Sequence, residues 1–145
     1  MKAADHIKRL CIAGASLAIA TQAWAQNYPP DTLVTATYHR GAGTMEQLAG
    51  TIDGRELSME AVYALNGSPM KMTVNGHLEG KTLSYTVTIK VIAANRTCTA
   101  TGTAAVESGM IQIALDQMEP DNSLCRQPSN ASYRRNLTIQ LPTPP

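Results

Sequence analysis

A strict alternation of apolar and polar residues is the feature that most constrains the fold. Residues 70–78 and 83–91 both place an apolar side chain at almost every second position. Such alternation is typical of a β-strand with one buried face and one face in water. Other stretches show the same pattern, the first two of them more weakly: 32–39, 45–52, 57–65, 98–106, 111–115 and 137–141. No convincing helical pattern follows residue 26, so the sequence predicts an all-β fold.

Turn-forming residues separate these stretches. Asp53-Gly54 is a type I′ hairpin signal, and the other turn-like segments are Asn66–Pro69, Gly80-Lys81 and Ser108-Gly109. Eight short strands in sequential order favour a small antiparallel eight-stranded up-and-down barrel, and a β-sandwich is the alternative. Eight strands are enough to close a small barrel, and closure removes the exposed sheet edges.

The first 25 residues have the pattern of a bacterial-type signal peptide. Lys2, Lys8 and Arg9 precede an apolar run, Leu10 to Ala20, and Ala23-Trp24-Ala25 is a cleavage site of small-x-small type. The apolar run is too short to span a bilayer, which needs about 20 residues. We therefore expect residues 1–25 to be removed after Ala25, and residues 26–145 to form a single all-β domain in the periplasm or outside the cell, without a membrane span.

Two cysteines remain after this cleavage, Cys98 and Cys125. In an oxidising compartment an even pair predicts a disulfide. Closing a loop of this length stabilises the fold by about 3.5 kcal/mol in the chain-entropy model. A redox-active pair is the alternative, although such pairs are usually spaced Cys-x-x-Cys.

An up-and-down order places both cysteines at the same end of the barrel. The longer connections are expected at this end: 40–44, 66–69, 93–96 and 119–132. Long loops on a rigid scaffold often carry function. We therefore expect a binding rim there, made of His39, Arg40, Asn66, Asn95, Arg96, Arg126 and Arg135.

Arg135 is unusual because strict alternation places it on the same face as Leu137 and Ile139. An inward arginine near a barrel mouth would bind an anionic group or pair with an acidic side chain; the alternative, which we favour, is that the last strand begins after Arg135. The stretch 57–65 is apolar on its second face too, at Val62 and Ala64. That face is either a partner surface or is covered by a loop.

Metal binding is a weaker hypothesis. Met70 and Met72 suit Cu(I), and His77 with Glu79 and a third ligand such as His39 suits zinc. Alternation instead places both methionines in the core, and no spaced His or Cys cluster supports zinc. We therefore expect no metal and no cofactor.

Composition and motifs narrow the function. Residues 1–25 hold Lys2, Lys8 and Arg9 of the 12 basic residues and Asp5 of the 11 acidic ones, so the remaining chain is near neutral and unsuited to nucleic acid. No Gly-x-Ser-x-Gly motif, P-loop or other nucleophile arrangement is present. We expect a non-enzymatic secreted or periplasmic domain that binds a partner protein, as an inhibitor or an assembly factor, through its long-loop end.

A small-molecule carrier is the main alternative, because the expected architecture resembles lipocalin-type carriers as well as bacterial periplasmic inhibitors of hydrolases. This resemblance is one of fold alone, and the lipocalin Gly-x-Trp signature is absent because the only tryptophan is Trp24. Large aliphatic residues are expected to fill the barrel, although Ala100, Gly102 and Ala104 are small enough to leave a gap inside.

Overall fold

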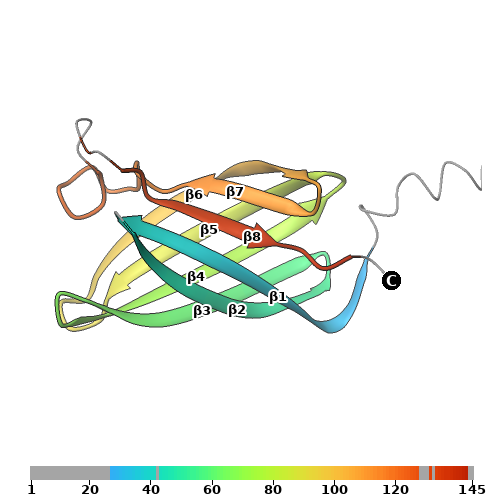
Figure 1. Ribbon diagram of the computed structural model, residues 1–145, viewed down its shortest axis with the longest axis horizontal. Helices are drawn as coiled ribbons and strands as arrows, with labels where there is room; N and C mark the ends of the chain where they lie inside the picture. Colours follow the sequence, from blue (N-terminus) through green and yellow to red (C-terminus); the bar gives the residue numbers. More distant parts are fainter. Residues whose placement is uncertain (1–26, 42, 128–130, 132, 144–145) are drawn as a thin grey trace, which may run out of the picture.

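The computed structural model is an eight-stranded antiparallel barrel in which each strand pairs with the next, and β8 pairs with β1 to close the wall (Figure 1). The structure describes residues 27–41, 43–127, 131 and 133–143, and within them it contains no helix. The predicted barrel is confirmed, and the alternative β-sandwich is wrong. The strands are β1 (Tyr28–Gly41), β2 (Thr44–Gly54), β3 (Glu56–Leu65), β4 (Ser68–Glu79), β5 (Thr82–Val91), β6 (Arg96–Glu107), β7 (Met110–Ala114) and β8 (Asn136–Gln140).

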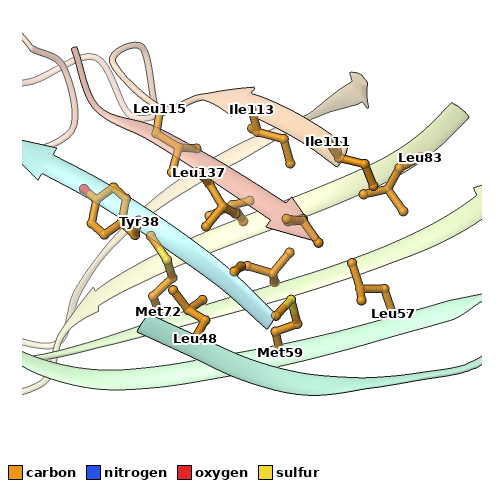
Figure 2. Close-up of a cluster of buried hydrophobic side chains, with 14 of the residues drawn as sticks. Tyr38, Leu48, Leu57, Met59, Met72, Leu83, Ile111, Ile113, Leu115 and Leu137 are labelled. Atoms are coloured by element: carbon orange, nitrogen blue, oxygen red, sulfur yellow. The ribbon is translucent and has the colours of Figure 1, made fainter. Parts of the chain in front are cut away.

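The barrel interior is filled by aliphatic and methionine side chains, as the alternation predicts (Figure 2). In β7, for example, Ile111 and Ile113 are buried while Gln112 between them is exposed. Met59 and Met72 occupy core positions, where their flexible thioethers fill irregular gaps. Burying one side chain of this size contributes roughly 1.5–3 kcal/mol, so the packed interior is a main source of stability.

Inward-facing glycines let the strands coil tightly. A Cβ on Gly50 would lie 2.0 Å from the carbonyl oxygen of Ser58, so β2 and β3 can approach closely only because residue 50 has no side chain. Gly102 remains exposed but lies opposite Tyr85 of the neighbouring strand, whose hydroxyl would be 2.9 Å from an added Cβ. The gap expected beside Gly102 is therefore at least partly occupied by this tyrosine ring.

The barrel has two ends, which we name by their connections. The loop end carries the β1–β2, β3–β4, β5–β6 and β7–β8 connections, and the turn end carries the other three (Figure 1). The prediction of longer loops is right for β5–β6 and for β7–β8, which runs from Leu115 to Arg135. It is wrong for β1–β2 and β3–β4, because residues 44 and 68–69 already belong to strands. Asn66 and Gly67 both have positive φ, which produces a tight hairpin turn.

The predicted disulfide between Cys98 and Cys125 is present, with a Cα–Cα distance of 5.3 Å. It fastens the long β7–β8 connection to β6. Next to it, Thr99 and Glu119 exchange two backbone hydrogen bonds of 2.8 Å. The connection is therefore attached to the barrel wall by a covalent bond and by a short backbone bridge.

A slit interrupts the wall between β6 and β7. These strands pair only at Val106–Ile111 and Glu107–Met110, and the next pairing along β6 is the bridge between Thr99 and Glu119. In the part of the chain that the structure describes, residues 100–105 have no ladder partner on this side. The slit is thus closed by hydrogen bonds at both of its ends.

The turn end is closed by apolar packing. Tyr28 is only 3% exposed, and its hydroxyl donates a hydrogen bond of 2.9 Å to the carbonyl oxygen of Pro142. The Leu141 N–H donates to the carbonyl oxygen of Gly109 at 2.8 Å, so the chain after β8 is held against the β6–β7 turn. This arrangement seals the barrel on the side opposite to the long connection.

Candidate functional site

A pocket of about 230 Å³ opens at the loop end of the barrel. We call it the mouth pocket. Its polar lining consists of Tyr38, Tyr63, Tyr133, Arg40, Arg126, Arg135, Ser123 and Gln127. Its apolar lining includes Leu65, Met70, Ile89, Val91, Cys98 and Leu124. The site therefore combines cations and phenols with apolar side chains, and none of the acidic residues that the structure describes lines it.

Two tyrosines lie where β1 and β3 reach the mouth. Tyr38 and Tyr63 face inward in the alternation of their strands, with ring centroids 6.1 Å apart. Burial raises the pKa of both phenols above the usual value, and the guanidinium groups of Arg135 and Arg40 only partly offset this rise in Tyr38. Both phenols therefore stay neutral near pH 7, where they can donate hydrogen bonds.

Two of the three arginines have carboxylate partners. Arg40 Nε lies 3.0 Å from Glu46 Oε1, and the Arg40 guanidinium carbon lies 5.6 Å from the centre of the Tyr63 ring, a cation–π distance. Arg126 pairs with Glu119 through Nη2 and with Asp121 through Nε, the latter at 3.2 Å. These pairs are partly exposed, so they orient the side chains more than they stabilise the fold.

Arg135 is held in a different way. Its backbone N–H donates to Gln127 Oε1 at 3.1 Å, its carbonyl oxygen accepts from Leu115 at 2.9 Å, and its Nη2 donates to the Cys125 carbonyl oxygen at 2.8 Å. Its Nε is buried without a hydrogen-bond partner among the described residues, where no ion pair to its guanidinium is found either. A buried unsatisfied donor costs about 1–3 kcal/mol and is uncommon in native proteins.

Exposed apolar side chains gather at the same end of the barrel. Of the large hydrophobic residues that are exposed in the described chain, most lie on or beside the loop end: Met45 55%, Val62 67%, Leu65 37%, Ile92 43% and Tyr133 42%. We call these five residues the apolar rim. No loop covers Val62 or Ala64, so the second apolar face of β3 is open to solvent. Exposed apolar side chains that gather at one end of a small domain are candidates for an interaction site.

The structure brings together three of the residues predicted for the binding rim. Arg40, Arg126 and Arg135 line the mouth pocket, and β8 begins one residue after Arg135, the alternative favoured from the sequence. The other four do not line it: His39 follows inward-facing Tyr38 on the other face of β1, Asn66 and Asn95 occupy exposed turns, and Arg96 is the exposed first residue of β6.

Sequence reasoning missed Tyr38, Tyr63 and Gln127. The two tyrosines had a usable signal, because each occupies an inward position of a strand close to its loop end. Gln127 had none: it lies in the aperiodic β7–β8 connection and is 8% exposed, with its side chain on the Arg135 backbone.

The metal alternatives do not fit the structure. Met70 and Met72 are 4% and 0% exposed, so their predicted core placement is confirmed. The His77 imidazole contacts the Glu56 carboxylate near the turn end. His39 lies opposite Met45 and Asn136 in the strand register, close to the loop end. The proposed zinc ligands thus lie at opposite ends of the barrel. Within the described ranges no group of three or more His, Cys, Asp or Glu residues is placed to hold a metal ion.

No family model matches this sequence, and no curated protein or solved structure is detectably similar to it. The described residues contain no helix of the length and hydropathy needed to cross a membrane. The predicted signal peptide, residues 1–25, lies outside the described residues.

Proposed function

We propose that this protein is a secreted or periplasmic, non-enzymatic domain that binds a partner protein through its loop end, as an inhibitor or an assembly factor would. The main observation is that the apolar rim lies at the same end as a pocket lined by arginines and tyrosines. Protein interfaces combine apolar surface with a few tyrosine and arginine residues that carry most of the binding energy. The signal peptide read from residues 1–25 supports the location.

The size of the pocket favours a protein partner over a small-molecule cargo. The mouth pocket measures about 230 Å³, whereas pockets for drug-sized ligands usually measure about 300–1,000 Å³. Below it, Met72, Val74 and Leu137 are fully buried in the packed interior. The space at the mouth suits one side chain of a partner better than a carrier's ligand.

Charge reversal of the apolar surface tests this function. The double variant Val62→Asp/Ile92→Asp alters the apolar rim, and Leu33→Asp is the matched control because Leu33 is 76% exposed on β1 outside the rim. The tagged protein is used to capture partners from the cell envelope of its own host, and each captured protein is then purified and titrated against the three proteins. We expect to find a partner that binds the double variant at least about tenfold more weakly than the unaltered protein, a loss of about 1.4 kcal/mol in binding free energy. Its affinity for Leu33→Asp should be unchanged.

Two results would contradict the proposal. One is a partner that binds the double variant as tightly as the unaltered protein. The other is native mass spectrometry of the protein from its own host showing a retained small molecule and no captured protein, which would favour the carrier.

A further inference from the structure

We propose that the mouth pocket is a receptor for a single carboxylate, presented by an aspartate or glutamate side chain of the partner. The partner as the source of this group depends on the proposed function, whereas the affinity of the pocket for a carboxylate depends only on its own residues.

Arg135 has hydrogen-bonding capacity that the free protein does not use. Its backbone and Nη2 are fixed by Gln127, Leu115 and Cys125, but its Nε is buried without a partner. A carboxylate entering the pocket meets the Arg135 guanidinium, which lines it. Arginine binds carboxylates through paired N–H groups of this kind.

The carboxylates around the pocket are shared unequally among its three arginines. Arg40 is paired with Glu46, and Arg126 is paired with Glu119 and Asp121. Arg135 has no such carboxylate among the described residues, and none of the acidic residues lines the pocket. The three arginines and their three carboxylates sum to zero, so an entering anion is attracted by the unpaired Arg135 guanidinium itself and not by a net positive charge. A phosphate carries about −1.5 to −2 charges, which a single guanidinium would balance only in part.

The phenols supply neutral donors next to this cation. Burial keeps the pKa of Tyr38 and of Tyr63 above the ordinary tyrosine value. The Tyr38 phenol is near enough to Arg135 for the two to interact by charge and hydrogen bonding. A carboxylate bound to Arg135 can therefore accept a second hydrogen bond from a tyrosine hydroxyl, and hydrogen bonds to ionised acceptors are stronger than neutral ones.

The remaining lining suits the aliphatic stem of an acidic side chain. Leu65, Met70, Ile89 and Val91 line the same pocket and provide apolar contacts beside the polar groups. The volume of about 230 Å³ admits a side chain of a few heavy atoms. Glutamate offers this combination of a short methylene stem and one carboxylate.

Titration with small probes tests the receptor without the partner. The probes are N-acetylglutamate N-methylamide, its neutral isostere N-acetylglutamine N-methylamide, and inorganic phosphate, and binding is followed by the NMR resonance of the Arg135 Nε–Hε group. We expect a saturable shift with the glutamate probe, at an affinity at least about tenfold tighter than for the glutamine isostere. Phosphate is expected to bind more weakly than the glutamate probe.

Three variants separate recognition from folding. Arg135→Gln removes the charge and is expected to abolish the binding, which is followed in this variant by backbone amide resonances. Tyr38→Phe removes one hydroxyl, keeps the ring and weakens binding several-fold. Arg55→Gln is the control, because Arg55 lies at the turn end, where its Nε donates to Asn27 Oδ1; it is expected to bind the glutamate probe normally.

Equal binding of the two amino-acid probes, preferential binding of phosphate, or no saturable shift with any probe would overturn the carboxylate receptor. If Arg135→Gln still binds a partner that the apolar-rim variant has lost, the proposed function stands and this inference fails. If instead the glutamate probe binds but no partner depends on the rim, the receptor stands and the proposed function fails.

Discussion

The two ends of the barrel are closed in different ways. At the turn end, Tyr28 and Leu141 are buried, and short turns bring the strands together. At the loop end, arginines and tyrosines occupy the equivalent inward positions, and a long connection is attached by the disulfide. The same eight strands thus carry an apolar closure on one side and a polar opening on the other.

This difference shows how a small barrel can separate stability from recognition. Apolar burial at the turn end contributes to folding without offering a surface to a partner. The loop end instead leaves a buried donor unpaired on Arg135 and keeps apolar side chains in water. Features of this kind lower the stability of the fold and are expected at the surface that binds a partner.

Removing the disulfide is expected to have the largest effect, because the loop end depends on it. Replacing Cys98 and Cys125 together by alanine frees a connection that the 27-residue separation of the cysteines otherwise constrains. The chain-entropy model predicts a loss of about 3.5 kcal/mol in the free energy of unfolding, measured by urea denaturation. Affinity for the glutamate probe should fall too, since Cys125 supplies the carbonyl that holds Arg135 Nη2. A loss below about 1 kcal/mol would show that packing alone holds this end.

A cavity at the turn end is expected to lower the free energy of unfolding and to leave the affinity for the glutamate probe unchanged. Ile111 is fully buried where β6 and β7 pair, and Ile111→Ala should lower the free energy of unfolding by about 3 kcal/mol through lost burial and the cavity left behind. Urea denaturation measures the loss, and the glutamate titration should give the affinity of the unaltered protein. A changed affinity would mean that the two ends are coupled.

The smallest expected effect is a loss of stability at alkaline pH. Burial raises the folded-state pKa of Tyr38 and Tyr63 above the reference value of 10.0. Above pH 10 the unfolded chain therefore loses these protons first, and stability, which is fully present below pH 10, falls as pH rises towards the folded pKa values. The slope is at most about 1.4 kcal/mol per pH unit for each tyrosine.

Thermal denaturation across this range checks the tyrosine effect. The double variant Tyr38→Phe/Tyr63→Phe should lose more of the alkaline slope than Tyr28→Phe at the turn end, because two phenols are removed instead of one. The pKa of Tyr28 is also raised by burial, so equal slopes in the two variants would contradict the assignment to the mouth.

Much of the fold follows from local sequence. In β5, Leu83, Val87 and Ile89 alternate with polar residues, and the structure buries them as the period of two requires. The pairing of Cys98 with Cys125 followed from two inferences: removal of the predicted signal peptide would leave an even number of cysteines, and a meander places both at one end. These inferences succeeded because they depend on a backbone period and on strand order.

The site was less accessible to sequence reasoning. Whether Arg40 or its neighbour His39 lines the pocket depends on where β1 stops alternating at the mouth, and β1 has an irregular register between His39 and Gly41. The positions of Arg126 and Gln127 depend on the conformation of the β7–β8 connection, which has no hydrophobic period. Asn66 was predicted for the rim because it stood in an apparent loop, but that segment is a tight turn.

The slit between β6 and β7 has a consequence for local opening of the native state. The Val106 N–H bonds to Lys81 on the β5 side, whereas the Thr99 N–H bonds to Glu119 across the slit. Alternation between these points directs the amides of Thr101, Thr103 and Ala105 into the slit, where amide hydrogen exchange is expected to be fast while amides bonded to β5 remain protected. The slit is therefore a weak point of the barrel wall, and the first partial opening of the native state is expected to spread from it.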